Sequence, residues 1–311
     1  MRDRATSASQ PDLSIAQRQN AADLLDLLRA ALVTHATTRR LVGIRICLAL
    51  VVAASSLLAA FMPGAREPVA IIGALWAVAY SVGVSGWARG YTTRAAVLHE
   101  MFDVRLYGLP WNAVFAGDPI DWYEVKQIAK RYRGSDDDVR NYYEVTTLPR
   151  PYDIAVCQIQ NLAWGSRIRR RYRQVVIAGV TAWSAGGVLI GLFAGLTVTQ
   201  LVLWWFVPSL GVILLGVDTY RVQVEVEQER RRALQVLQGW LKNPLVGQQA
   251  AVEMEALCRR VQDVIFVTRK QHTRVPAWFF ERFRDADRID FKDAILDLES
   301  TLTSASRPAV P

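Results

Sequence analysis

Arginine and tyrosine side chains lie close together in the middle of the chain, where they could hold a phosphate-bearing ligand. Guanidinium groups hydrogen-bond two phosphate oxygens at once, and aromatic rings stack on flat bases. Tyr142 and Tyr143 suit a hydrophobic core equally well, so both roles stay open for them. The candidate ligand-binding residues are Arg131, Arg133, Arg140, Tyr142, Tyr143 and Arg150.

Patterns typical of catalytic or metal sites are missing from the sequence. His35, His99 and His272 are far apart, and no two of them have metal-ligand spacing. Asp136-Asp137-Asp138 is the one acidic cluster, and it is more typical of a solvated loop than of a calcium site. No nucleophile elbow and no phosphate-binding glycine loop occurs. The sequence therefore predicts no enzyme, no metal and no cofactor.

Four long apolar runs dominate the rest of the chain, and they come in two pairs. Val42–Met62 has 21 residues and Val69–Ala88 has 20. Val175–Leu196 has 22 residues and Gln200–Val217 has 18. At about 1.5 Å per residue these runs extend over roughly 27–33 Å, close to the hydrocarbon thickness of a bilayer, which is about 30 Å. The sequence predicts four membrane spans arranged as two helical hairpins.

The arginines predict how these spans are oriented. Basic residues favour the cytoplasmic side of a membrane, and only Arg66, offset by Glu67, lies in the two hairpin turns. We therefore expect both turns outside and both termini in the cytoplasm. The arginines that flank the spans on the other side are Arg39, Arg40, Arg89, Arg94, Arg167, Arg169, Arg170, Arg171, Arg173 and Arg221.

The net charge of +8 lies mainly beside the predicted membrane surface. Residues 89–174 carry 14 Lys and Arg against 10 Asp and Glu, whereas residues 218–311 carry 15 against 14. Anionic lipid headgroups favour each nearby cation by about 1 kcal/mol. Because no strip of interleaved basic and aromatic residues appears, anionic lipids are the expected partners of this charge and nucleic acid is not.

The predicted fold is an all-α membrane protein in which two transmembrane hairpins carry a cytoplasmic helical domain. Helical spacing of apolar residues follows Ser14, and Pro110 and Pro149 divide the middle segment into short helices. Val222–Leu241 should continue the fourth span until Asn243-Pro244 ends it. The predicted regions are an N-terminal amphipathic helix (1–41), hairpin 1 (42–88), the cytoplasmic middle segment (89–174), hairpin 2 (175–217), the cytoplasmic C-terminal helical region (218–302) and a disordered tail (303–311).

Small residues inside the spans predict close helix contacts. Small side chains let helices approach each other in lipid. The contact could lie within one chain, between subunits of a homo-oligomer or along a pore. The residues concerned are Gly187, Gly191, Gly195, Ser81, Ser85, Thr181 and Ser184.

Further features, spread over nearly the whole chain, carry a family resemblance. Ile15 and Gln19-Asn20 lie in the leading helix, Phe102-Asp103 follows the first hairpin, and Val275–Phe279 lies near the end. The other motif positions are Pro110, Trp111, Asn112, Asp121, Trp122, Tyr123, Gln158, Asn161 and Trp164. On these residues the chain resembles the SMODS-associated four-transmembrane (S-type) pore-forming effectors of bacterial CBASS-like antiphage systems. Gly165 departs from the family pattern, which has an acidic residue after the tryptophan.

The resemblance implies a function that composition and periodicity do not. It implies an effector in the bacterial inner membrane, triggered by a cyclic oligonucleotide that an operon-linked nucleotidyltransferase makes on infection. The arginines and tyrosines of the middle segment would then bind that nucleotide. Two other readings fit the pattern of spans: a membrane scaffold or regulatory protein that recruits cytoplasmic partners, and, less well, a lipid-modifying enzyme.

Overall fold

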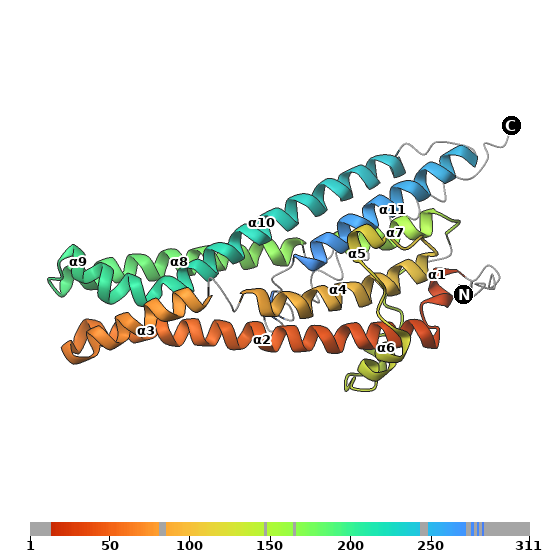
Figure 1. Cartoon of the computed structure of the whole chain (residues 1–311). Coiled ribbons are helices and arrows are strands. Elements are labelled where there is room, and N and C mark those ends of the chain that lie inside the picture. The colour runs from red at the N-terminus through yellow and green to blue at the C-terminus, as the bar shows by residue number, and fades with distance from the viewer. Residues whose placement is uncertain are drawn as a thin grey trace.

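The computed structural model describes residues 14–80, 85–145, 148–163, 166–242, 248–271, 275, 276, 279 and 282. Within these ranges the chain forms helices and no strand, which confirms the prediction of an all-helical protein. Figure 1 shows an elongated molecule with two parts. One part, here called the bundle, contains the C-terminal part of α2, α3, α8 and the N-terminal part of α10. The short helix α9 lies at the tip of the bundle. The other part, the helical domain, contains the N-terminal part of α2, the C-terminal part of α10 and the helices α1, α4, α5, α6, α7 and α11.

Helix α2 (Ala22–Phe61) runs through both parts without a break. Its first half buries Leu24 and Leu28 in the helical domain, because these side chains recur at helical spacing on one face. Its second half exposes large apolar side chains such as Val51 and Leu58. The amphipathic helix and the first span predicted from the sequence are therefore one helix of 40 residues.

The first hairpin closes at a 3-10 turn, Pro63–Ala65, and returns as α3 (Arg66–Ala79). Pro63 lacks the N–H that would continue α2, so the helix ends there. The Arg66 guanidinium lies 3.8 Å from the ring centroid of Trp204, and this contact joins the tips of the two hairpins. The part of the predicted second span that covers residues 81–84 lies outside the described residues.

The second hairpin consists of α8 (Ser166–Phe193) and α10 (Val207–Lys242). Gly195 makes the turn at φ +65°, a conformation that glycine adopts without a steric cost. The short helix α9 (Val198–Leu201) and a π-helical turn (Val202–Phe206) lead into α10. As predicted, α10 continues far beyond the apolar run and ends at Lys242, next to Asn243-Pro244.

Three stretches among the described residues are long and apolar enough to cross a membrane: Ala22–Phe61, Tyr152–Phe193 and Val198–Lys242. The bundle exposes apolar side chains along all of its helices, among them Leu48, Ile72, Leu189 and Leu203. Contiguous apolar surface of this kind is unfavourable in water and favourable in lipid. The chain is therefore a membrane protein, and these three stretches are its candidate spans by length and composition.

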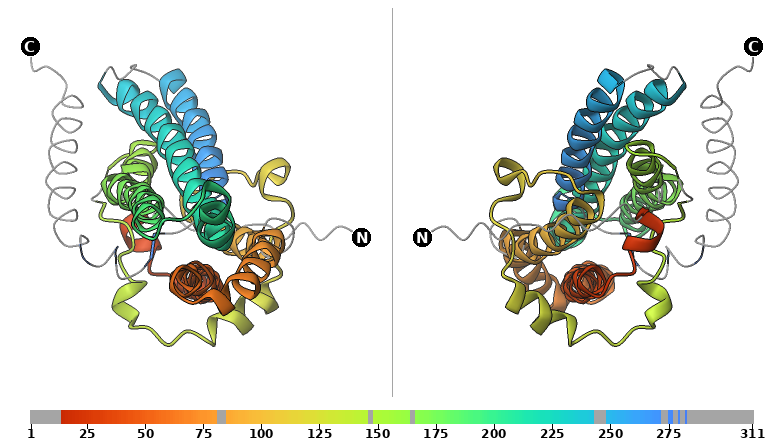
Figure 2. Two further views of the ribbon diagram at one scale, coloured as in Figure 1. Left: turned by 90° about the vertical axis from the view of Figure 1, so that its left-hand side faces the viewer. Right: turned by 90° about the vertical axis from the view of Figure 1, so that its right-hand side faces the viewer.

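The helical domain is built around the first half of α2 and the second half of α10. Seen along the long axis of the molecule, α10 and α11 lie side by side, and α2 is seen end-on (Figure 2). A hydrophobic core joins all these helices and includes Leu28, Phe102, Ile154, Leu237 and Ile265. The other helices of the domain are α1 (Ile15–Arg18), α4 (Ser85–Tyr107), α5 (Ala113–Ala116), α6 (Trp122–Ala129), a 3-10 turn (Asp136–Asp138), α7 (Tyr152–Ala163) and α11 (Gln248–Lys270).

Candidate functional site

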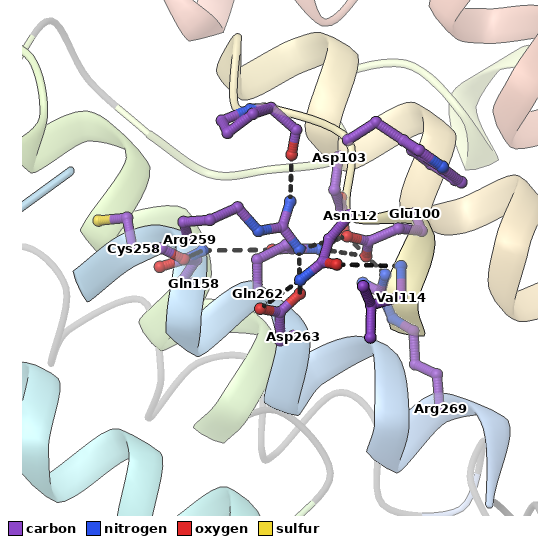
Figure 3. A network of polar contacts seen from close by, with 12 residues as sticks. Glu100, Asp103, Asn112, Val114, Gln158, Cys258, Arg259, Gln262, Asp263 and Arg269 are labelled. Atoms are coloured by element: carbon purple, nitrogen blue, oxygen red, sulfur yellow. Dashed lines mark hydrogen bonds and ion pairs between the residues drawn. The ribbon is translucent and has the colours of Figure 1, made fainter. Parts of the chain in front are cut away.

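Two acidic side chains of α4, Glu100 and Asp103, are buried where α4 faces α11 (Figure 3). Their exposed fractions are 2% and 0%, and their spacing of three residues places them on one helix face. Gln262 Nε2 donates to Glu100 Oε2 at 2.8 Å and to Asp103 Oδ2 at 3.0 Å. Arg269 Nη1 donates to Asp103 Oδ2 at 2.6 Å. These contacts compensate two buried carboxylates and hold α4 against α11.

Arg259 extends this network to the loop that follows α4. Its Nη2 donates to Glu100 Oε1 at 2.9 Å and to Asp263 Oδ1 at 2.6 Å, and its Nη1 donates to Pro110 O at 3.0 Å. Asn112 Nδ2 donates to both Asp263 oxygens, at 3.1 and 3.2 Å (Figure 3). The loop is therefore fixed to α11 by charged groups at both of its ends. We call Glu100, Asp103, Arg259, Gln262 and Arg269 the buried network.

Tyr143 connects the buried network to Gln19, at the end of α1, and to α7. Its hydroxyl donates to Asp103 Oδ1 at 2.7 Å and accepts from Asn161 Nδ2 at 3.2 Å. Its backbone exchanges two hydrogen bonds with the Gln19 side chain, at 2.8 and 3.1 Å. Gln158 Nε2 on α7 donates to Cys258 O and to Gln262 Oε1, at 2.8 and 3.2 Å. Segments far apart in the sequence thus meet at one polar centre.

The electrostatics of this centre favour a fixed structure over acid–base chemistry. Burial, and then Asp103, raise the pKa of Glu100, although hydrogen bonds from Gln262 and Arg259 oppose this shift. Burial opposes the charge of Arg269, but Asp103 beside it raises the pKa of Arg269 above its usual value. Burial raises the pKa of Tyr143 well above its usual value, so its hydroxyl stays protonated and donates to Asp103. Burial also raises the pKa of Cys258 to about 12, which makes this thiol a poor nucleophile.

A second ionic contact joins α8 to α10 at the junction between the bundle and the helical domain. Arg170 Nη2 lies 3.0 Å from Glu227 Oε1, and Arg173 Nη1 lies 2.6 Å from Glu227 Oε2. Glu227 is itself buried, so both arginines compensate its charge. No group of three or more His, Cys, Asp or Glu residues that could hold a metal ion occurs among the described residues.

The described residues thus form a buried polar centre that joins distant segments of the helical domain, and this domain is attached to apolar helices. A family model for the SMODS-associating 4TM effector domain matches residues 13–298. The chain belongs to this effector family. The resemblance inferred from the sequence motifs is therefore confirmed.

A relative of this effector carries a matching description. The chain is 20% identical, over 274 residues, to a probable CBASS effector molecule of Bacillus cereus (strain VD146). The match covers 85% of this chain and 91% of that protein. No solved structure matches the chain.

The effector presents the predicted ligand-binding arginines on its surface. Arg131 and Arg133 are exposed in the loop after α6. Arg140 is exposed 3.9 Å from Asp136, and Arg150 is exposed 3.7 Å from Asp153. Of the two predicted tyrosines, Tyr142 is half-buried and Tyr143 is buried, with their ring centroids 5.0 Å apart. The ligand-binding role of these residues stays a prediction.

Most of the family motif residues of the effector hold the domain together. Pro110, Asn112, Gln158 and Asn161 make the contacts of the polar centre described above. Trp111 Nε1 donates to Gly117 O at 2.8 Å, and Asp121 Oδ1 caps α6 by accepting from Tyr123 N at 2.8 Å. Trp122 packs against the core with Arg105 over its ring, whereas Tyr123 is 72% exposed. Trp164 lies outside the described residues.

The small residues of the spans are divided between helix packing and exposed positions. Gly187 and Gly191 are buried, and a Cβ on either would meet Trp205 or Leu201 of the same hairpin. Packing within one chain therefore occupies Gly187 and Gly191, while Gly195 forms the hairpin turn. The remaining residues are Thr181, which is exposed, Ser184, which is half-buried, Ser81, which lies outside the described residues, and Ser85, of whose side chain nothing is described.

Sequence reasoning did not select Gln262 or Arg230, and it named Arg269 only as a second-choice ligand-binding residue together with Arg259, Arg260 and Lys270. A signal for the buried positions of α11 nevertheless exists. Gln262 and Arg269 lie on the apolar face of α11, in line with Cys258 and Ile265 at helical spacing. A polar residue on the buried face of an amphipathic helix needs a partner in the core. The same signal marks Glu100 and Asp103 on α4, but it does not identify which residues meet.

Proposed function

We propose that this chain is a membrane-disrupting effector of a bacterial antiphage abortive-infection system. A cyclic oligonucleotide binds its helical domain, and several copies then form a pore in the inner membrane. An operon-linked nucleotidyltransferase supplies the nucleotide. The observation that carries the proposal is the continuity of α2 and α10, since each helix runs unbroken from the core of the helical domain into an apolar bundle. The description of the relative as a probable CBASS effector supports it.

The packing of the bundle supports an assembly of several copies. Trp183 stacks on Trp205 with ring centroids 5.0 Å apart, and its Nε1 donates to Ser209 Oγ at 2.8 Å. These side chains fill the space between α8 and α10. A single bundle filled in this way conducts only after rearrangement, so a homo-oligomer is the economical route to a pore. Cations at the junction, such as Arg170 and Arg173, would lie near anionic lipid headgroups.

The first test measures membrane integrity in living cells. When the chain and its nucleotidyltransferase are expressed together in a bacterium and phage is added, we expect a membrane-potential dye to report depolarisation before the cells lyse. Cells that express the chain alone serve as the control and should keep their potential. Arrest of the phage without depolarisation would favour the scaffold reading, in which the domain recruits partners and opens no pore.

The second test measures topology by cysteine labelling. Cys47 is exposed, so it is first replaced by serine. We expect a membrane-impermeant maleimide to label Ala65→Cys and Val198→Cys on intact cells, because both lie at hairpin tips. Asp136→Cys should react only after the membrane is permeabilised. The proposed orientation has both termini in the cytoplasm. The opposite labelling pattern would contradict it.

A further inference from the structure

Three arginines from different helices lie near one another at the junction between the bundle and the helical domain, since Arg230 contacts Thr268 beside Arg269 and the charges of Arg169 and Arg269 both act on it. Arg169 lies at the start of α8, Arg230 on α10 and Arg269 on the last turn of α11. Arg230 is 6% exposed. Its Nε donates to Thr268 Oγ1 at 3.0 Å and its Nη1 to Asn161 O at 3.1 Å, and both acceptors are neutral. We call Arg169, Arg230 and Arg269 the arginine cluster.

Arg169 has a buried donor without an acceptor. Its Nη1 is inaccessible to solvent and has no hydrogen-bond partner within the described parts of the chain. Burial lowers the pKa of Arg169 to about 10, and Glu227 opposes that shift. Glu227, however, already pairs with Arg170 and Arg173. A guanidinium in this position keeps unused hydrogen-bonding capacity directed into the protein.

The positive charge of the cluster exceeds the negative charge around it. Asp103 pairs with Arg269 and also accepts from Gln262 and Tyr143, so its acceptor capacity is largely used. Burial lowers the pKa of Arg230 well below its usual value, and the charges of Arg169 and Arg269 lower it further. Buried charges are costly unless they are paired. Among the carboxylates that the structure describes, none forms an ion pair with Arg230, and none accepts a hydrogen bond from Arg169 Nη1.

We propose that Arg169 and Arg230 form a binding site for a phosphate-bearing anion at the junction of the bundle and the helical domain. A phosphodiester offers several acceptor oxygens, so it can accept from two guanidinium groups at once. Two sources share this chemistry: the cyclic oligonucleotide, in which case the site rests on the proposed function, and an anionic lipid headgroup. Bound phosphate would neutralise the surplus positive charge and draw α8 toward α10. This movement would take place where both helices enter the bundle.

The experiment compares full-length variants in lipid nanodiscs. Arg169→Met removes the charge with little loss of packing, Arg169→Lys keeps the charge, and Arg171→Met, at an exposed position on the same helix, is the matched control. One arm titrates a panel of cyclic di- and trinucleotides by calorimetry in phosphatidylcholine nanodiscs. The other arm compares Tm in phosphatidylcholine and phosphatidylglycerol nanodiscs without nucleotide. Without ligand, Arg169→Met should melt at the wild-type Tm or above it, since no described hydrogen bond is lost.

The outcomes separate the site from the proposed function. The site with the nucleotide as its ligand is supported if Arg169→Met binds nucleotide at least tenfold more weakly than the wild type. Arg169→Lys should then recover part of the affinity, and Arg171→Met should bind as the wild type does. The site with lipid as its ligand is supported if phosphatidylglycerol raises the Tm of the wild type and of the other variants but not that of Arg169→Met. If, in addition, no nucleotide binds the wild type, the nucleotide trigger is ruled out. If wild type and Arg169→Met bind nucleotide equally and respond equally to phosphatidylglycerol, the site is overturned and the proposed function stands. Absence of a response to both ligands overturns the site and the trigger.

Discussion

Replacing Asp103 with alanine is expected to lower the free energy of unfolding by about 3–5 kcal/mol, the range measured when one partner of a buried ion pair is removed. The Asp103 carboxylate accepts from Tyr143, Gln262 and Arg269 in a fully buried site. Its loss leaves the Arg269 charge without its closest compensation and leaves two further donors unsatisfied. The helical domain should therefore unfold at a lower denaturant concentration.

Chemical denaturation in detergent micelles, followed by circular dichroism, measures this loss. Asp136→Ala is the matched control, because Asp136 is also an aspartate that pairs with an arginine, Arg29, at 2.7 Å. Asp136 is exposed, so its removal should leave the midpoint close to that of the wild type. A loss below about 1 kcal/mol for Asp103→Ala would mean that the buried network is not a main source of stability.

Replacing Gly73 with leucine is expected to abolish membrane depolarisation and toxicity. A Cβ at this position on α3 would clash with the backbone of Pro208 on α10, and backbone cannot move aside as a side chain does. The two hairpins would have to separate, and overpacking of this kind typically costs about 1–3 kcal/mol or more. We expect colony counts after induction to return to the level of cells that carry an empty vector.

Gly179→Leu on α8 is the matched control for this change. A Cβ on Gly179 meets nothing within 4 Å, and the residue lies in an apolar span as Gly73 does. Both variants should insert into the membrane in equal amounts on immunoblots of membrane fractions. Full toxicity of Gly73→Leu would show that close packing of the two hairpins is not needed for function.

Much of the helix pattern could be predicted from the sequence because it depends on local periodicity. Apolar spacing after Ser14 predicted the buried face of α2, and Pro110 and Pro149 marked the short helices of the middle segment. Asn243-Pro244 marked the end of α10. The continuity of α2 was not predicted: the sequence analysis divided the chain after residue 41, whereas α2 passes through this position without a break.

The polar centre could not be predicted because its partners are distant in the sequence. Asp103 and Arg269 are separated by 166 positions, and no spacing rule relates residues so far apart. Motif residues such as Gln158 and Asn161 were selected through the family resemblance, but their partners in the core follow only from the packing of α7 between α10 and α11. Arg169 was assigned to the membrane surface with its neighbours, whereas the structure turns its Nη1 inward.

Because α2 and α10 pass from one part of the molecule to the other unbroken, each of them works as a lever arm. With 40 and 36 residues, at about 1.5 Å per residue, they are about 60 Å and 54 Å long. A rotation of about 5° at one end of such a rod moves the other end by about 5 Å, nearly the pitch of one helical turn. α2 contains no proline between Ala22 and Phe61, and α10 contains none after Pro208, so neither rod has a proline hinge at the boundary that would absorb this motion. A repacking in the helical domain that changes no single contact greatly would thus produce a large displacement of the hairpin tips.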